Sequence, residues 1–539
     1  MKGRSNYFKR LCLIRNNKPV VYNIASIAVF LYFLFWWTYK LASLPGLHGD
    51  EAWFALKGVE FNQSGIHELQ GMNSYTGIFQ SLFDSIFFKI FHIGIIEMRV
   101  TGVILNLSAI AILYSVFRSL RKPKTFIIFS LLLSQSALFL ISPRVAWEVN
   151  TFTFFSIAVL FASAVRILTN NKRSNGLNHW LFLAANLFGS YNHIIFSCVS
   201  LSALCAYILW CIHSRSIIKR HFGILLFLNA GNVTALFVVM QANLFKSLQQ
   251  QLWAPVLACL ALIIEAFVLY HFTNKSSHTD IVPCKLNNNT SALATIVVHL
   301  IIAFCLASFM FYHGIALIDV FSNYRLLMHA YSYPVSPILE TIMTTAAVVL
   351  MGSLAYCLAN DLFSRKKSPV AFFIVIYMGA LSFYTERTSF RYYLAISIIL
   401  ILYLAWRAST PGMRKQPLFA AATGMFLCLN LSLITIFRSD YKIKKALRFQ
   451  IGNGQVETSA HFLPNQPLID SLAQNKIGDI RYGSGRYFME QPILFYKLLR
   501  PWNEQKEKSA AISYDYRGTG KDGFIFQTST ADNIPLPSK

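Results

Sequence analysis

The sequence predicts an all-α polytopic membrane protein that ends in a small α/β domain. Of its 539 residues 55% are hydrophobic and only 13% are charged, which is too apolar for a soluble protein of several domains. Long apolar runs follow one another from residue 20 to residue 437, and each can form the roughly 20 residues of helix that cross a bilayer. After Phe437 the apolar runs stop and charged residues become frequent.

Thirteen apolar runs are long enough, or nearly so, to cross the membrane as helices. They lie near residues 20–41, 98–117, 125–141, 150–168, 178–190, 193–212, 222–241, 252–272, 292–312, 337–358, 369–384, 390–406 and 417–437. The runs at 178–190 and 369–384 are the shortest. The basic stretch before residue 20 resembles a signal peptide, but residues 46–50 make a poor cleavage site, so we interpret the first run as a retained helix.

The basic excess follows the loops between these runs. The chain has a net charge of +25, and its Lys and Arg residues gather in short loops on one side, such as 118–124. This pattern encodes membrane orientation rather than nucleic-acid binding, and it predicts a cytoplasmic amino terminus. Thirteen spans then place the tail outside the membrane. None of the nine Cys lies in the outer loop around Asp50 or in the tail, which favours a bacterial inner (plasma) membrane.

Two domains follow from this arrangement. Residues 1–437 form the predicted membrane module, which includes a long outer loop at 42–97. Within that loop the segments 50–62 and 78–93 carry apolar residues at helical spacing, as helices in the membrane interface do. Residues 438–539 form a predicted soluble extracytoplasmic α/β domain with 15 Lys and Arg and 10 Asp and Glu.

Acidic residues concentrate in the first outer loop. Before the tail the chain has 13 Asp and Glu, and six of them lie between His48 and Glu97. Asp50 and Glu51, in the stretch HGDEAWFALKG, come directly after the first apolar run, where a charge is costly unless it meets water or a polar ligand. A carboxylate here can act as a general base toward an attacking hydroxyl. The alternative is that both acids only stabilise a helix start, as an N-cap and a first-turn residue.

Several basic residues are predicted on the same side of the membrane as Asp50. Arg makes forked hydrogen bonds to phosphate oxygens, and positive charge stabilises a phosphate leaving group. For Arg144 and Arg391 the alternative is snorkelling at the interface, or a salt bridge to Glu148 or Glu386. The residues that we predict to bind a donor phosphate are Arg144, Arg391, Lys89 and Arg99.

Two other polar residues are candidates for substrate binding. His193 sits between two apolar runs on the outer side, although a lone His in such a place is often structural instead. Arg325 lies in a second outer loop at 314–337, which is rich in Tyr, His and Pro and can cover a cavity. The spacing of His and acidic residues matches no HExxH or EF-hand pattern, so no metal site is predicted.

With these features the chain resembles the GT-C membrane glycosyltransferases, in particular the branch that contains protein O-mannosyltransferases and the aminoarabinose transferases of lipid A. The likeness covers roughly the first 210 residues well and the remaining runs loosely. Ile78 stands where the family usually has Pro after a Tyr-Thr-Gly turn. The stretches that carry the likeness are HGDEAWFALKG, Tyr75-Thr76-Gly77, Glu97-Met98-Arg99-Val100 and Arg391-Tyr392-Tyr393.

The resemblance implies a polyprenyl-phosphate sugar donor, an extracytoplasmic acceptor, Asp50 as base and Glu51 as its helper. It also makes Tyr75 a substrate-binding candidate. It leaves a divalent metal open and implies no other cofactor. The sequence therefore predicts an inverting transfer of a hexosyl or pentosyl group to a hydroxyl of lipid A, a surface glycan or a protein.

Two other functions suit a polytopic basic chain. A flippase or transporter of lipid-linked glycans should show charged or Gly- or Pro-broken spans in corresponding positions of two halves. Here the predicted spans are nearly free of acids apart from Glu265, which we interpret as a neutral, hydrogen-bonded structural residue. A structural or assembly factor would instead use the tail to bind a partner.

Overall fold

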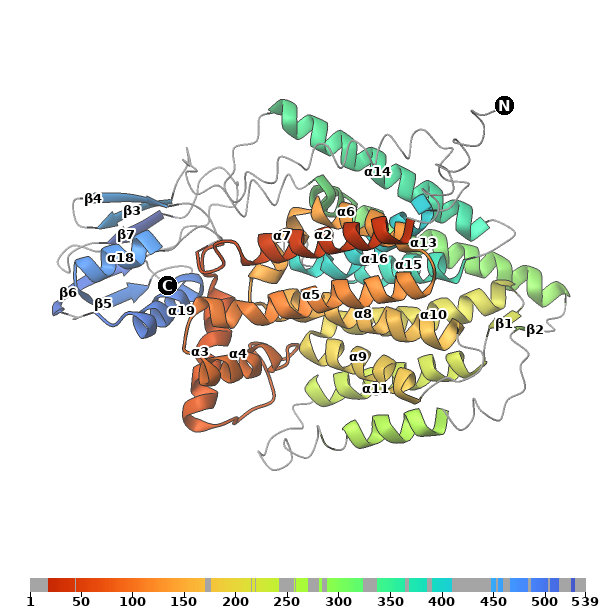
Figure 1. Cartoon of the computed structure of the whole chain (residues 1–539), viewed down its shortest axis with the longest axis horizontal. Coiled ribbons are helices and arrows are strands. Elements are labelled where there is room, and N and C mark those ends of the chain that lie inside the picture. Colours follow the sequence, from red (N-terminus) through yellow and green to blue (C-terminus); the bar gives the residue numbers. More distant parts are fainter. Residues whose placement is uncertain are drawn as a thin grey trace, which may run out of the picture.

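The computed structural model shows a bundle of long helices, with a smaller group of strands and helices beyond one end (Figure 1). Helices dominate the described residues, as the sequence predicts. The structure describes residues 18–43, 45–169, 176–214, 216–218, 220–241, 256, 258–269, 281–283, 288–322, 337–363, 368–384, 390–409, 447–451, 454–458, 466–482, 486–502, 505–512 and 525–528.

Eight helical segments in the described part of the chain are long and apolar enough to cross a membrane. Large apolar side chains are exposed along them, such as Phe227 and Phe304, and such exposure suits lipid rather than water. The chain is therefore a multi-pass membrane protein. The helices in these segments are α2 (Lys18–Thr38), α5 (Ile95–Ser119), α8 (Glu148–Thr169), α10 (Ser197–Ser214), α11 (Arg220–Gln241), α13 (Asn288–Ser322), α14 (Pro337–Phe363) and α16 (Leu394–Ser409).

The other predicted spans take different forms. The run at 125–141 becomes a bent pair, in which α6 (Pro123–Ser134) and the following segment Ala137–Arg144 meet at 85°. That segment contains α7 (Ala137–Ile141) and the 3-10 turn η1 (Ser142–Arg144). Three runs form helices that are shorter than a full span within the described residues, namely α9 (Gly176–Asn192), the apolar helix Ala258–Leu269, beside which residues 257 and 270 are not described, and α15 (Pro369–Leu381). The run at 417–437 lies outside the described residues.

The helix α16 anchors the middle of the bundle. Its first twelve residues, 394–405, are all buried, and the helix packs against α6 and α8. A 3-10 turn, η4 (Phe390–Tyr393), leads into α16. This turn brings Arg391 next to Asp50, which is far away in the sequence.

Two helices outside the bundle follow α2, where the sequence predicts helices in the outer loop. They are α3 (Gly49–Ser64) and α4 (Phe79–Ile90), which pack on each other at one end of the bundle (Figure 1). Gly58 permits this close approach, because a Cβ at that position would lie 2.9 Å from the Cβ of Asp84. The helix α4 leaves Ile86, Lys89 and Ile90 exposed, as a helix at a membrane interface does.

The described part of the tail contains both strands and helices. The strand β3 pairs antiparallel with β4, with Ile451 opposite Gly454, and parallel with β7. The strands β5 and β6 pair in parallel, with Tyr482 opposite Ile512. These elements are β3 (Leu447–Ile451), β4 (Gly454–Thr458), α18 (Gln466–Gln474), β5 (Ile477–Tyr482), α19 (Arg486–Leu499), β6 (Gln505–Ile512) and β7 (Ile525–Thr528).

The tail packs directly on the helix that carries the acidic pair. Buried side chains of α18 and α19, including Ile493 and Tyr496, share an apolar cluster with Ala52 and Val59 of α3. The ring of Phe495 also lies over Phe88 of α4, with the two centroids 6.3 Å apart. At the opposite end of the bundle two short strands, β1 (Ser216–Ile218) and β2 (Ile281–Pro283), pair antiparallel (Figure 1).

Candidate active site

The first turn of α3 is closed by a capping box. His48 is the N-cap residue, and its Nδ1 accepts a hydrogen bond from the Asp50 N–H at 3.1 Å. The Glu51 carboxylate in turn accepts from the His48 N–H at 3.1 Å. These reciprocal bonds satisfy backbone donors that a helix start leaves open. His48 therefore performs the capping role that was the alternative for Asp50.

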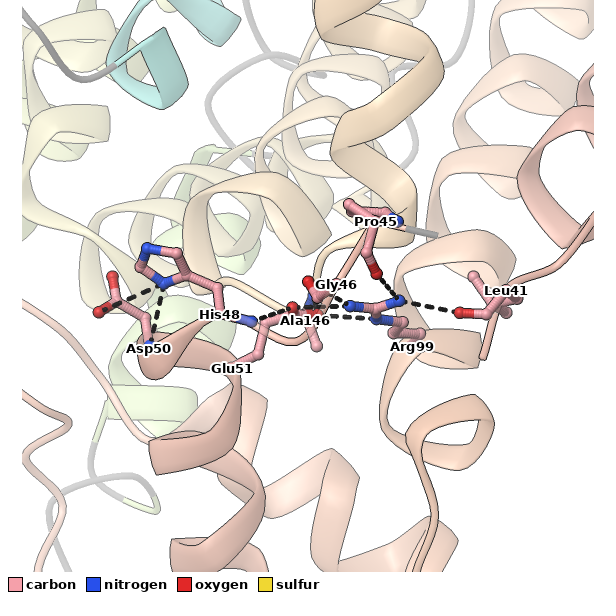
Figure 2. A network of polar contacts seen from close by, with 8 residues as sticks. All are labelled: Leu41, Pro45, Gly46, His48, Asp50, Glu51, Arg99 and Ala146. Atoms are coloured by element: carbon pink, nitrogen blue, oxygen red, sulfur yellow. Dashed lines mark hydrogen bonds and ion pairs between the residues drawn. The ribbon is translucent and has the colours of Figure 1, made fainter. Parts of the chain in front are cut away.

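The carboxylate of Glu51 is fixed by a buried ion pair with Arg99 of α5 (Figure 2). Arg99 Nε and Nη2 donate to the two carboxylate oxygens at 2.9 and 2.8 Å. The backbone N–H of Ala146 adds a third bond to Glu51, at 2.8 Å. Both side chains are fully buried. Glu51 thus ties α3 to α5 and to the segment between η1 and α8.

The remaining N–H groups of Arg99 donate hydrogen bonds to the backbone. It donates to the carbonyl oxygens of Leu41, Pro45 and Gly46 at 2.9, 2.8 and 3.2 Å. Together with the two bonds to Glu51, these contacts use all five N–H groups of a guanidinium. Arg99 therefore has no N–H left for a phosphate, and we do not propose it as a phosphate ligand.

The carboxylate of Asp50 meets a different arginine. Asp50 Oδ2 accepts a hydrogen bond from Arg391 Nη1 at 2.6 Å, and the two side chains are 9% and 17% exposed. The guanidinium also donates to the Tyr392 hydroxyl at 3.2 Å and stacks on the Trp147 ring, with its carbon 4.8 Å from the centroid. The structure therefore brings together two predicted site residues that lie 341 positions apart.

A second acid, Glu148, stands at the start of α8 beside this pair. Its charge interacts with Asp50 and Arg391, and its carboxylate lies 4.0 Å from His193 Nε2. The sequence indicates Glu148 only as a salt-bridge partner for a nearby arginine. One signal could have found it: acids are rare in the membrane module, and Glu148 stands at the edge of an apolar run.

Tyr75 and His193, both predicted to bind substrate, lie against each other. The Ile194 N–H donates to the Tyr75 carbonyl at 3.0 Å, and the Gly77 N–H donates to the Asn192 carbonyl at 3.2 Å. This pairing sets the Tyr75 ring 5.4 Å from the His193 ring, which also lies 5.2 Å from the Tyr392 ring. The turn of the outer loop thus reaches the same place as Glu148 and Arg391.

Both histidines of the site are neutral. Burial lowers the pKa of His193 to about 3, and the charge of Arg391 adds to this effect. Burial also lowers the pKa of His48, against the opposing effect of Asp50. His48 Nδ1 lies 3.8 Å from Asp50 Oδ1. Because this nitrogen already accepts the Asp50 N–H, the contact is not an ion pair.

The other predicted phosphate ligands lie elsewhere. Arg144 is fully buried, and its guanidinium donates to the carbonyl oxygens of Trp36 and Tyr39 at the end of α2. These contacts satisfy a helix C-terminus. Lys89 is exposed on α4. Arg325 lies outside the described residues.

The described residues hold no group of three or more His, Cys, Asp or Glu side chains that fits a metal ion. Asp50 and Glu148 instead face the guanidinium of Arg391.

Among the comparisons with known proteins, the one with solved structures found matches. No family model and no curated protein sequence matches the chain. Similar solved structures include the Archaeoglobus fulgidus oligosaccharyltransferase tethered with an acceptor peptide containing the NVT sequon, at 14% identity and a TM-score of 0.40. Its complex with Zn and sulfate matches at 12% and 0.46. ArnT from Cupriavidus metallidurans bound to undecaprenyl phosphate matches at 11% and 0.37.

The chain resembles GT-C glycosyltransferases. The two oligosaccharyltransferase matches cover 78% and 96% of this chain, but only 54% and 59% of the oligosaccharyltransferase chain. The ArnT match covers 93% of this chain and 94% of ArnT. At such identities and TM-scores the likeness carries no argument about the reaction.

Proposed function

We propose that the protein is an inverting glycosyltransferase that moves a sugar from a polyprenyl-phosphate donor to a hydroxyl of an extracytoplasmic acceptor. The observation that carries this proposal is the 2.6 Å contact between Asp50 and Arg391. It joins a carboxylate that can take a proton to a cation that can hold a phosphate.

The reaction assigns one task to each partner. The Asp50 carboxylate takes the proton of the acceptor hydroxyl while the oxygen attacks the anomeric carbon from the face opposite the phosphate. The bond between that carbon and the phosphate oxygen breaks, and its electron pair leaves with the polyprenyl phosphate. Arg391 stabilises the negative charge that develops on this phosphate. Its Nε has no partner among the described residues, so a donor is available for a phosphate oxygen.

The remaining site residues support these two. The negative charges of Glu148 and Asp50 both act on the Arg391 guanidinium and favour its charged form. Glu51 helps only indirectly, because its pair with Arg99 fixes the turn that carries Asp50. We keep Tyr75 and His193 as substrate-binding residues, since they lie beside Glu148 and Tyr392.

The setting of the reaction is part of the proposal. The distribution of basic loops supports a cytoplasmic amino terminus in an inner (plasma) membrane, with Asp50 and the tail on the outer side. The acceptor is then lipid A, another surface glycan or a protein hydroxyl, all of which are reached from that side.

The test is sugar transfer by purified protein with the substitution Asp50→Asn, which keeps the size of the side chain and removes the base. Removing a general base typically lowers the rate about 10²- to 10⁴-fold. Glu60→Gln is the matched control, because Glu60 lies on the same helix in a surface pair with Lys57. A wild-type transfer rate in Asp50→Asn would overturn the proposal. Movement of a lipid-linked sugar across proteoliposomes without any transfer product would favour the transporter instead.

A further inference from the structure

A buried gap between two polar side chains lies beside the proposed base. Glu148 Oε1 and His193 Nε2 are 4.0 Å apart, and both side chains are only 4% exposed. Within the described residues, neither Glu148 Oε2 nor His193 Nε2 has a hydrogen-bond partner. Buried polar atoms are normally paired, so the unpaired His193 Nε2 and the unpaired second oxygen of the adjacent Glu148 carboxylate indicate an occupant that the protein itself does not supply.

One of these two groups is a hydrogen-bond donor and the other is an acceptor. His193 Nδ1 accepts from the Ile195 N–H at 3.2 Å, so the proton of the neutral ring sits on Nε2, which is a donor. The Glu148 carboxylate is an acceptor. A hydroxyl satisfies both, because it accepts from one group and donates to the other. Glu148 Oε1 and His193 Nε2 are 4.0 Å apart. A hydroxyl oxygen can therefore lie about 2.8 Å from both atoms, which is the usual length of a hydrogen bond.

Aromatic rings flank this gap. The His193 ring lies between Tyr75 and Tyr392, with centroid distances of 5.4 and 5.2 Å. Rings with a few well-placed polar groups are typical of sites that bind small organic molecules. A sugar ring combines the two properties required here, since it presents hydroxyls at its edge and C–H groups on its faces.

We propose that Glu148 and His193 bind a ring hydroxyl of the sugar that the polyprenyl phosphate carries. This inference rests on the proposed function, in which Arg391 beside Glu148 holds the phosphate. The hydroxyl on the carbon next to the anomeric centre is the one closest to that phosphate. Glu148 and His193 then determine specificity, because a site built to bond a hydroxyl rejects a substrate that lacks it.

The experiment compares binding of bare and sugar-bearing lipids to full-length protein in nanodiscs. The probes are undecaprenyl phosphate and its glucosyl, mannosyl and 4-amino-4-deoxyarabinosyl forms, with the 2-deoxy analogue of the form that binds most tightly. A second arm adds the matching methyl glycosides to protein already saturated with undecaprenyl phosphate. The variants are Glu148→Gln, His193→Phe and His193→Gln. The control is His92→Phe, which removes an exposed ring that lies 3.1 Å from Glu97.

The wild-type protein should prefer the best sugar-bearing lipid over the bare lipid, and this preference should fall about 10-fold or more in His193→Phe and for the 2-deoxy analogue. Binding of the bare lipid should stay unchanged in His193→Phe. Glu148→Gln should change binding of the bare lipid as well, because that substitution removes a negative charge that acts on Arg391. His193→Gln, which keeps an N–H donor, should retain part of the preference. A loss confined to the methyl glycosides would assign the bound hydroxyl to the acceptor and would contradict the assignment to the donor sugar.

Three further results would overturn the inference: no preference in the wild type, no effect of His193→Phe, or an equal loss for the bare lipid in that variant. The gap would then hold only water or serve packing. The proposed function fails separately, because a protein that shows the His193-dependent preference but never transfers sugar keeps the site and loses the reaction.

Discussion

Asp50 and Glu51 are neighbours in the first turn of α3, yet their carboxylates have opposite surroundings. Glu51 is fully buried, and its partner Arg99 uses every N–H within the protein. Asp50 pairs with Arg391, which is partly exposed and keeps its Nε without a partner among the described residues. Figure 2 shows the two acidic side chains leaving the helix in opposite directions.

The difference teaches how one helix start can serve both structure and chemistry. A buried ion pair stabilises only when all its groups are bonded, and the pair of Glu51 and Arg99 meets that condition. It holds the turn in place from the side of α5. In the pair of Asp50 and Arg391, the Nε of Arg391 has no partner among the described residues, so a ligand can accept a hydrogen bond from it. The packing of α19 on α3 adds further support to the same helix.

The largest expected effect comes from removing the structural acid, Glu51. Glu51→Gln leaves the buried guanidinium of Arg99 without its counter-charge, which costs about 3–5 kcal/mol for a buried pair. We expect a large drop in the melting temperature of the purified protein and poor yield. Glu60→Gln, on the exposed face of α3, should change neither. Equal stability of Glu51→Gln and the wild type would show that the pair does not hold α3.

A second substitution sharpens the functional half. Arg391→Lys keeps the positive charge but loses the planar guanidinium, which donates one hydrogen bond to Asp50 and another to Tyr392. A hydrogen bond to a charged group contributes about 1.5–3 kcal/mol, so binding of undecaprenyl phosphate should weaken about 10- to 100-fold. Arg118→Lys, at the exposed end of α5, is the control. Unchanged binding in Arg391→Lys would remove the arginine from the phosphate site.

The contact of α3 with α4 can be tested at a glycine. In Gly58→Ala the new Cβ would lie 3.0 Å from two backbone atoms, Ser81 O and Ser85 N, so the helices must move apart. Overpacking of this kind costs about 1–3 kcal/mol. Gly231→Ala in α11 meets nothing within 4 Å and should be neutral or stabilising. Thermal unfolding of both variants is the measurement, and equal stability would show that α3 is not tightly held.

The smallest effect concerns pH. The pKa of His193 is about 3 in the folded protein and about 6.5 when unfolded, so the unfolded state binds the extra proton between these values. This contribution to stability is fully present above pH 6.5 and is lost as the pH falls toward 3. At pH 5.5 it amounts to a loss of about 1.4 kcal/mol. Replacing His193 with Phe should flatten the fall in melting temperature between pH 7.5 and 5.5, and an unchanged slope would contradict the assignment.

Patterns in the sequence predicted the architecture better than the site. Apolar runs and the spacing in the outer loop predicted the long helices, α3 and α4, because lipid and packing impose regular periods. The 85° bend between α6 and α7 was not predictable, since Gln135 and Ser136 at the break are neither Gly nor Pro. The tail was predicted as a separate domain, but no pattern indicated that α19 packs on α3.

The arginines show why site prediction stops short. Arg99, Arg144 and Arg391 all stand near ends of apolar runs that the sequence places on one side of the membrane. Residue type cannot tell which guanidinium is occupied by carbonyl oxygens. Arg99 uses all its N–H groups on carbonyl oxygens and Glu51, and Arg144 donates to two carbonyl oxygens, whereas the Nε of Arg391 has no partner among the described residues. Glu148 was missed because an acid in the first turn of a helix has an ordinary structural explanation. Only the fold brings it beside Asp50 and His193.

The most direct test of the central claim measures two properties of one Asp50→Asn preparation: its affinity for undecaprenyl phosphate and its rate of sugar transfer in a single turnover. If Asp50 is the base and Arg391 holds the phosphate, the variant should bind the lipid at least as tightly as the wild type, because the guanidinium is released from its carboxylate partner. Its transfer rate should nevertheless fall about 10²- to 10⁴-fold. Weakened lipid binding with an unchanged transfer rate would contradict the account.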